Sequence, residues 1–205
     1  MGSRGGRSAG PGSSRGVVRI VGGRYKRTPV PVADREGLRP TPERVRETLF
    51  DWLRHLFGTL EGLVCCDMFA GSGALGLEAA SRGARRVVSL ELDRRGALAL
   101  RAVVDKLKAA DVLEVVQCDA FVWLQRNQEK FDVVFIDPPF AAGLQKKAVA
   151  AALGHLAAGG LIYLESDADY DEEALSEMGV KSVRAGRAGA VFYRLVAPIA
   201  DARGS

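Results

Sequence analysis

Residues 67–76 read Asp-Met-Phe-Ala-Gly-Ser-Gly-Ala-Leu-Gly and contain three glycines at the spacing G-x-G-x-x-G. An apolar run precedes this stretch and a helical pattern follows it, which places the loop at the carboxyl end of a strand. Open α/β sheets bind ligands there, and glycines let the backbone approach a ligand closely. The stretch therefore predicts a loop for an adenosine-containing cofactor, with Phe69, Gly71 and Gly73 as candidate binding residues. A tight structural turn is the alternative.

Five short apolar runs, separated by helical stretches, extend from residue 63 onward. This order is typical of βαβ units and of a mainly parallel sheet. The predicted strands are Leu63–Phe69, Arg86–Leu92, Leu113–Cys118, Phe131–Asp137 and Leu161–Glu165. Residues 180–183 and 190–196 flank two glycines and predict an antiparallel hairpin on one edge of the sheet. The predicted fold class is therefore α/β, with a Rossmann-like sheet and flanking helices.

Four segments divide the chain. Residues 1–16 are almost entirely Gly, Ser, Arg, Ala and Pro, which predicts a disordered tail because such residues bury little apolar surface. Residues 17–57 predict a small basic β arm and then a helix from Pro42 to Phe57, with Thr41 as its N-cap. Residues 58–197 form the main domain, and residues 198–205 form a second tail.

The composition favours an ordinary globular domain. Of 205 residues, 47% are apolar, which is enough to build a core. No apolar run approaches the ~20 residues of a membrane helix, and the N-terminus lacks the apolar region of a secretory signal. We therefore expect a cytoplasmic protein without a membrane partner. The histidines and cysteines show no metal-ligand spacing, so we expect no metal site.

Carboxylates follow the predicted strands at the edge where the glycine loop lies. Glu91 stands 20 residues after Gly71, the spacing at which a carboxylate binds ribose hydroxyls. Asp119 can accept from an adenine amino group while the Ala120 amide addresses a ring nitrogen. Asp67 suits a cationic amino group and a sulfonium better than a pyrophosphate, which favours S-adenosylmethionine over NAD. Each carboxylate alone has a helix cap or a surface charge as its alternative.

The fourth predicted strand ends in Asp137-Pro138-Pro139-Phe140. Prolines fix φ and lack amide hydrogens, so this loop presents acceptors only, namely the Asp137 carboxylate and the Pro138 carbonyl. An exocyclic amine offers two N–H donors, and binding both can aim its nitrogen lone pair at a methyl group. Phe140 supplies a flat face on which an extruded base can stack. These four residues are the candidate catalytic residues, and a capped Pro-Pro turn is the alternative.

Basic charge gathers in the first quarter of the chain. Residues 1–54 hold 12 Lys or Arg against 5 Asp or Glu, which leaves 17 against 20 for the rest. Such a surface suits a polyanion because each neutralised phosphate releases counterions. RNA or DNA is therefore a candidate partner, and Arg24, Lys26 and Arg27 in the arm are the candidate residues for binding it, for RNA in the main hypothesis. From charge alone, a solvated surface is an equal alternative.

Several segments together resemble the RsmD family, bacterial methyltransferases of the guanine N2 in 16S rRNA. The resemblance spans about residues 17–197 and is carried by residues 19–26, 38–50, 69–79, 137–140 and 186–189. It implies a class I methyltransferase fold, S-adenosylmethionine as cofactor and small-subunit rRNA as partner. It also places the region before the first long helix beside cofactor and RNA. That adds Arg39, Thr41, Arg44 and Arg46 to the candidate RNA-binding residues. The chain departs from the family at Leu100–Val104, where members usually carry an asparagine.

The sequence is also compatible with other functions. A DNA adenine-N6 or cytosine-N4 methyltransferase would use the same chemistry at Asp137–Phe140. A nicotinamide-dependent oxidoreductase fits the glycine loop but leaves that tetrapeptide unexplained and lacks an evident acid or base. A catalytically silent RNA-binding module would need only the basic arm. For the main hypothesis, naked rRNA and an assembling small ribosomal subunit are both possible substrates, and we expect a monomer.

Overall fold

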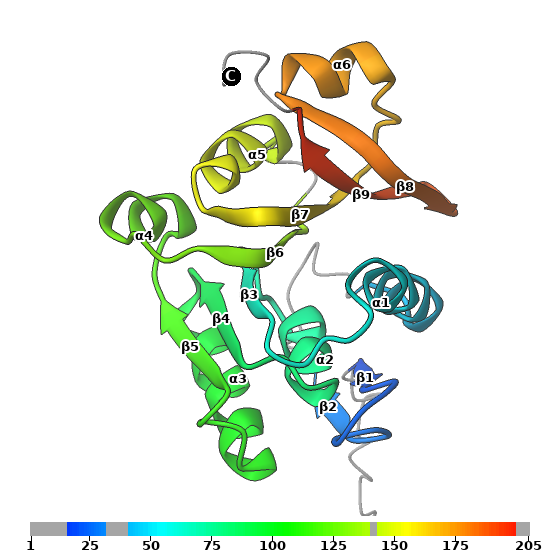
Figure 1. Ribbon diagram of the computed structural model, residues 1–205. Coiled ribbons are helices and arrows are strands. Elements are labelled where there is room, and N and C mark those ends of the chain that lie inside the picture. Colours follow the sequence, from blue (N-terminus) through cyan, green and yellow to red (C-terminus); the bar gives the residue numbers. More distant parts are fainter. Residues whose placement is uncertain (1–15, 32–40, 140–142, 200–205) are drawn as a thin grey trace, which may run out of the picture.

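A computed structural model describes residues 16–31, 41–139 and 143–199 (Figure 1). The predicted tail at residues 1–16 therefore lies outside the described residues except for Gly16, as does the predicted tail at residues 198–205 beyond Ile199. Two candidate site residues, Arg39 and Phe140, also lie outside them. Among the residues that the structure describes, no helix is long and apolar enough to cross a membrane.

A seven-stranded sheet forms the centre of the molecule (Figure 1). Its order is β5-β4-β3-β6-β7-β9-β8, and the first five of these strands run parallel. The strands are β3 (Val64–Asp67), β4 (Arg86–Glu91), β5 (Leu113–Gln117), β6 (Phe131–Ile136), β7 (Leu156–Ser166), β8 (Val180–Ala188) and β9 (Val191–Pro198). β9 pairs antiparallel with both β7 and β8. The predicted α/β sheet and its closing hairpin are confirmed.

Helices cover both faces of this sheet. They are α1 (Glu43–Phe57), α2 (Ala74–Ser81), α3 (Arg94–Leu107), α4 (Ala120–Arg126), α5 (Gln145–Leu153) and α6 (Glu172–Glu177). Leu49, Leu77 and Leu100, from α1, α2 and α3, belong to one buried cluster. Leu124 and Val149, from α4 and α5, belong to the other. Because both faces are buried, the central strands read as continuous apolar runs rather than as alternating ones.

The start of α1 differs from the prediction. Pro42, not Thr41, is the N-cap residue, and no side chain caps the helix there. The Thr41 hydroxyl instead donates to Asp137 Oδ2 at 3.2 Å. A tertiary partner has replaced the local one, because the chain brings residues 96 apart together at this corner. Thr41 therefore belongs to the site rather than to the helix end.

The N-terminal arm is a two-stranded hairpin, as predicted. β1 (Val17–Arg19) pairs antiparallel with β2 (Pro29–Pro31). Between them, the chain packs against the end of α2. Gly23 has φ +75°, and a Cβ at that position would lie 1.8 Å from the Ser81 carbonyl oxygen, so only glycine fits there. The contact holds the arm close to the main sheet.

Glu78 on α2 anchors this arm. Its carboxylate is completely buried and accepts from the backbone N–H groups of Val21 and Gly22, each at 2.8 Å. It also pairs with Arg46 of α1 at 3.1 Å and with Arg82 at 2.8 Å. A buried carboxylate with four donors is fully satisfied, so its charge is tolerated in the interior. One side chain thereby joins the arm, α1 and the helix that follows the glycine loop.

Candidate active site

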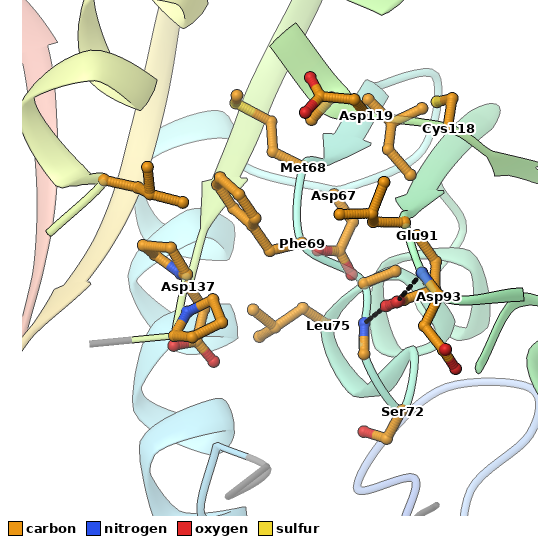
Figure 2. Close-up of a pocket in the computed structure, with 18 of the residues that line it drawn as sticks. Asp67, Met68, Phe69, Ser72, Leu75, Glu91, Asp93, Cys118, Asp119 and Asp137 are labelled. Atoms are coloured by element: carbon orange, nitrogen blue, oxygen red, sulfur yellow. Dashed lines mark hydrogen bonds between the residues drawn. The ribbon is translucent and has the colours of Figure 1, made fainter. Parts of the chain in front are cut away.

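A cavity of about 770 Å³ opens at the carboxyl ends of β3, β4, β5 and β6 (Figure 2). This size suits a ligand as large as a nucleoside cofactor. Its lining includes most of the residues predicted from the sequence: Thr41, Asp67, Phe69, Gly71, Glu91, Asp119, Ala120, Asp137, Pro138 and Pro139. In Figure 2, Asp137 lies on one side and Glu91 on the other, with Phe69 and Leu75 between them. The structure therefore brings the glycine loop, the strand-end acids and the Asp-Pro-Pro segment together.

Glu91 is held in a fixed orientation. The backbone N–H of Gly71 donates to Oε2 and that of Asp93 donates to Oε1, each at 2.8 Å, and Figure 2 draws both bonds. A carboxylate has about four lone-pair positions, so these bonds orient it while it can still accept from a ligand's hydroxyls. The sequence did not single out Asp93, which lines the same cavity and caps α3 by accepting from Gly96.

Glycine is required in the loop itself. Gly73 has φ +77°, and a Cβ there would lie 2.2 Å from the Leu100 Cδ1. Gly71 also has a positive φ, 53°. Both positions lie in the left-handed region that other residues rarely adopt. The loop geometry therefore depends on these two predicted glycines, whichever ligand it binds.

Asp67 is a buried carboxyl at the base of the loop. It accepts from the backbone N–H of Gly76 at 3.1 Å. Burial raises its pKa from the ordinary value of 3.8 to about 7, although hydrogen bonds from the backbone of Gly76 and Phe69 oppose that rise. A cation that binds beside such a carboxyl stabilises its ionised form. The position thus favours a positively charged part of a ligand.

Asp67 should make the stability of the unliganded protein depend on pH. Its pKa is higher in the folded than in the unfolded state, so ionisation opposes folding and stability falls as pH rises from about 4 to about 7. A rise of about three pKa units corresponds to about 4 kcal/mol. In Asp67→Asn, we expect a smaller decrease in the free energy of unfolding between about pH 5 and about pH 8, measured by urea denaturation. An unchanged decrease would mean that Asp67 is ionised throughout this range.

Asp119 both caps a helix and lines the cavity. Its Oδ1 caps α4 by accepting from the backbone N–H groups of Phe121 at 2.8 Å and Val122 at 3.0 Å. Asp119 and Ala120 also line the cavity. A helix N-terminus presents N–H groups and a partial positive charge, which suits acceptor atoms of a ligand. Cap and binding site are therefore compatible at this position.

Asp137 follows β6 and reaches the cavity together with Pro138 and Pro139. Burial raises the pKa of the Asp137 carboxyl well above its usual range, and the neighbouring Glu165 carboxyl adds to the rise because the two groups repel each other when both are ionised. The Thr41 hydroxyl donates to it and acts in the opposite direction. The two prolines of this segment have no backbone N–H to donate, so the part of the cavity wall that they form is poor in donors.

Glu165 is a buried carboxyl beside Asp137, outside the cavity lining, that the sequence patterns did not single out. It lies on β7, is 3% exposed, and accepts from the Tyr163 hydroxyl at 2.6 Å. Burial raises the pKa of this carboxyl as well. A signal was present, because Glu165 is the last residue of a predicted strand, and Glu91 likewise stands close to the end of one. No motif contains it, so that signal stood alone.

The candidate RNA-binding residues separate into two groups. Arg24, Lys26, Arg27 and Arg44 are exposed. Arg46 is only 1% exposed, pairs with Glu78, and donates from Nε to the Thr41 carbonyl at 3.2 Å. The prediction that Arg46 contacts RNA is therefore wrong, because its guanidinium is buried and occupied. Its helical position gave the sequence no sign of the partner on α2.

The fold and the site define a class I methyltransferase. The solved structure described as "Putative methyltransferase yhhF from Escherichia coli" aligns with a TM-score of 0.75 and 38% identity over 89% of this chain and 98% of that chain. A putative methyltransferase complexed with SAH aligns with a TM-score of 0.60 at 17% identity, over 78% of this chain and 50% of that one, which shows the fold alone.

More similar sequences narrow the class to one family. The family described as "Conserved hypothetical protein 95" matches residues 18–197. Ribosomal RNA small subunit methyltransferase D from Haemophilus influenzae is 41% identical over 77% of this chain and 82% of its own length. The protein of the same name from Escherichia coli K12 is 42% identical over 77% and 78%. The chain belongs to the RsmD family of methyltransferases.

Proposed function

We propose that this protein transfers a methyl group from S-adenosylmethionine to the exocyclic N2 of a guanine in small-subunit rRNA. One observation carries the proposal: Asp137 and Pro138 line the same cavity as the strand-end acids Asp67, Glu91 and Asp119. A methyl donor and a substrate amine bound in that cavity would meet at the side where Asp137 lies. The names of the relatives from H. influenzae and E. coli supply the class of RNA.

The residues of the cavity fit the cofactor. Glu91 would hold the ribose hydroxyls, and Asp119 with the Ala120 amide would hold the adenine. Asp67, whose carboxylate is destabilised by burial, would pair with the cationic methionine end. S-adenosylmethionine supplies a methyl group activated by its sulfonium. The SAH bound to the distant structural relative is consistent with this assignment.

At the other side of the cavity, Asp137 and the Pro138 carbonyl would each accept one N–H of the guanine amine. Binding both hydrogens draws the nitrogen lone pair out of conjugation and directs it toward the methyl carbon. No base needs to act before attack. The proton that the methylated nitrogen must release can then pass to Asp137. Phe140 would stack on the extruded base, which typically contributes about 1–3 kcal/mol.

The exposed basic residues would bind the rRNA backbone. Neutralising Arg24, Lys26 and Arg27 together should weaken RNA binding and reduce its dependence on salt, by a slope of about one for each phosphate that is no longer neutralised. Cofactor affinity should not change. The matched control neutralises Lys106, Lys108 and Lys181, which are also exposed but lie at the end of α3 and on β8. If both triple variants give the salt slope of the unmodified protein, the arm is only a solvated surface.

Mass analysis of nucleosides from 16S rRNA tests the proposed function. A strain that lacks the gene should lose N2-methylguanosine at one position, and the purified protein should restore it with S-adenosylmethionine. Unchanged N2-methylguanosine would reject the rRNA assignment, and loss of N6-methyladenine or N4-methylcytosine from DNA would favour the DNA alternative. Calorimetry tests the alternative function, a nicotinamide-dependent oxidoreductase. Tight binding of NAD without binding of S-adenosylhomocysteine would reverse the choice of cofactor.

Two further questions are the form of the rRNA substrate and the oligomeric state of the protein. We expect naked 16S rRNA and isolated assembling subunits to differ as substrates, because one small domain has limited surface for reading RNA. Methyl transfer to either one excludes a catalytically silent RNA-binding module. A monomer in cytoplasm remains our expectation, and sedimentation of the purified protein measures the oligomeric state.

A further inference from the structure

Two carboxyl groups, those of Asp137 and Glu165, lie next to each other at the Asp137 side of the cavity. β6 and β7 are parallel neighbours, and Ile136 pairs with Leu164, so Asp137 and Glu165 follow at adjacent positions of the two strands. The Thr41 hydroxyl lies between them. It donates to Asp137 Oδ2 at 3.2 Å and is also hydrogen-bonded to the Glu165 carboxyl. Three side chains from separate parts of the chain thus form one continuous network.

The surroundings of this network strongly disfavour two negative charges. Glu165 is almost completely buried, and Tyr163 donates to its Oε1. The other groups that face the pair are Asp67 on β3, which adds negative charge, and Tyr193, which lies opposite Glu165 on β9. Arg46 reaches the Thr41 carbonyl, but its charge is paired with Glu78. Two carboxyls that interact in a site of low dielectric share one proton over a wide pH range.

The two possible positions of that proton are not equivalent. A protonated Glu165 donates to the Thr41 oxygen, and the Thr41 hydrogen then points to Asp137. The reverse arrangement would protonate Asp137 and remove its acceptor from the cavity. Glu165 is 3% exposed and does not line the cavity, while Asp137 is half-buried, borders the cavity and can receive N–H donors there, which favours the negative charge on Asp137. A bound amine would strengthen this preference.

We propose that Glu165 is a positioning residue for methyl transfer, which holds the single proton of the pair and, through Thr41, keeps the negative charge on Asp137. The proposal rests on the proposed function of Asp137 as the acceptor for the substrate amine. It gives Thr41 a role in orienting that acceptor rather than in binding RNA. Glu165 itself need not touch substrate or cofactor.

The test compares pH profiles of kcat for the unmodified protein, Glu165→Gln and Glu165→Leu. Glutamine keeps an acceptor for Tyr163 and a permanent donor for Thr41, so it should retain most of the rate that leucine loses. Loss of a hydrogen bond to a charged group corresponds to about a 10- to 100-fold lower rate. In the unmodified protein the rate should fall at alkaline pH as the pair loses its proton, and Glu165→Gln should lack that fall. Equal rates for glutamine and leucine, or an unchanged alkaline fall in Glu165→Gln, would overturn the proposal.

Thr41 provides an independent arm of the experiment. Thr41→Ser keeps the hydroxyl and should remain active, whereas Thr41→Val removes the link and should lose about 10- to 100-fold in kcat with little change in KM for the cofactor. Equal activity of serine and valine variants would contradict the relay. Glu173→Gln, an exposed carboxylate on α6, is the matched control for loss of one acid.

Thermal unfolding without substrate separates this inference from the proposed function. Ionisation of Glu165 opposes folding, since its pKa is raised in the folded state, so stability falls as pH rises. Glu165→Gln should therefore show a smaller decrease in Tm between about pH 6 and about pH 9 than the unmodified protein and Glu173→Gln. Identical Tm profiles would show that no shared proton exists. Failure of the unmodified protein to methylate guanine would reject the proposed function and leave this result intact.

Discussion

Asp137→Ala is expected to reduce the rate of methyl transfer by about 10²- to 10³-fold, the usual cost of removing one preorganised polar group from a reacting centre. The alanine removes the proposed acceptor for the substrate amine and breaks the hydrogen bond between Asp137 and the Thr41 hydroxyl. Cofactor affinity should hold, because Asp67, Glu91 and Asp119 lie on the other strand ends. Single-turnover transfer to 16S rRNA and calorimetry with S-adenosylhomocysteine measure the two effects separately.

Asp137→Asn distinguishes an acceptor from a base. Asparagine keeps a carbonyl oxygen in nearly the same place, and its amide can donate to Thr41, whose hydroxyl then donates to Glu165. We therefore expect this variant to retain part of the rate that alanine loses. If asparagine and alanine are equally inactive while both bind cofactor and RNA normally, the charge or basicity of Asp137 is essential, and the acceptor mechanism is wrong.

Glu78→Ala should lower the free energy of unfolding by about 3–5 kcal/mol, as expected when one partner of a buried ion pair is removed. The change leaves the buried Arg46 guanidinium without its carboxylate and removes the acceptor for Val21 and Gly22. Urea denaturation measures the loss. The matched control is Asp51→Ala, which breaks an exposed pair with Arg54 and should cost less than about 1 kcal/mol.

A second variant examines the cause of that loss. Replacing Glu78 by leucine and Arg46 by methionine together removes both charges and fills similar volume. Such replacements are often neutral or stabilising relative to the ion pair, so the double variant should be more stable than Glu78→Ala. The hydrogen bonds to Val21 and Gly22 would still be missing, which should loosen the arm. A double variant no more stable than Glu78→Ala would place the main cost in the lost contacts to the arm and to Arg82 rather than in the unpaired Arg46.

Local patterns were sufficient to predict the sheet and most of the cavity. Strands buried on both faces appear as short apolar runs, and their carboxyl ends meet at one edge, so Glu91 and Asp119 could be located by counting. The boundaries were less accurate. The predicted strand at residues 161–165 extends from Leu156 to Ser166, because β6 also pairs with Leu156, across an irregular stretch of small residues and glycines that carries no strand signal.

Contacts between distant segments could not be predicted in this way. Arg46 is charged and lies on an amphipathic helix, so the sequence favours an exposed position for it. Only the fold reveals that it pairs with Glu78. Thr41 precedes Pro42 in the pattern of an N-cap, yet its hydroxyl bonds to Asp137. Both depend on partners more than 30 residues away, and a single sequence records no such pairing.

The attachment of the arm to α2 has a consequence for the divergence of relatives. The arm contributes backbone N–H groups of Val21, Gly22, Arg24 and Tyr25 to this contact, and the acceptors belong to Glu78 and Ser81. Apart from the space that Gly23 requires, the outward side chains of the arm take no part in these bonds. Substitutions among them can accumulate without loss of the attachment. The surface of the arm, for which we propose RNA binding, can thus change in sequence while the main chain keeps the arm attached to α2.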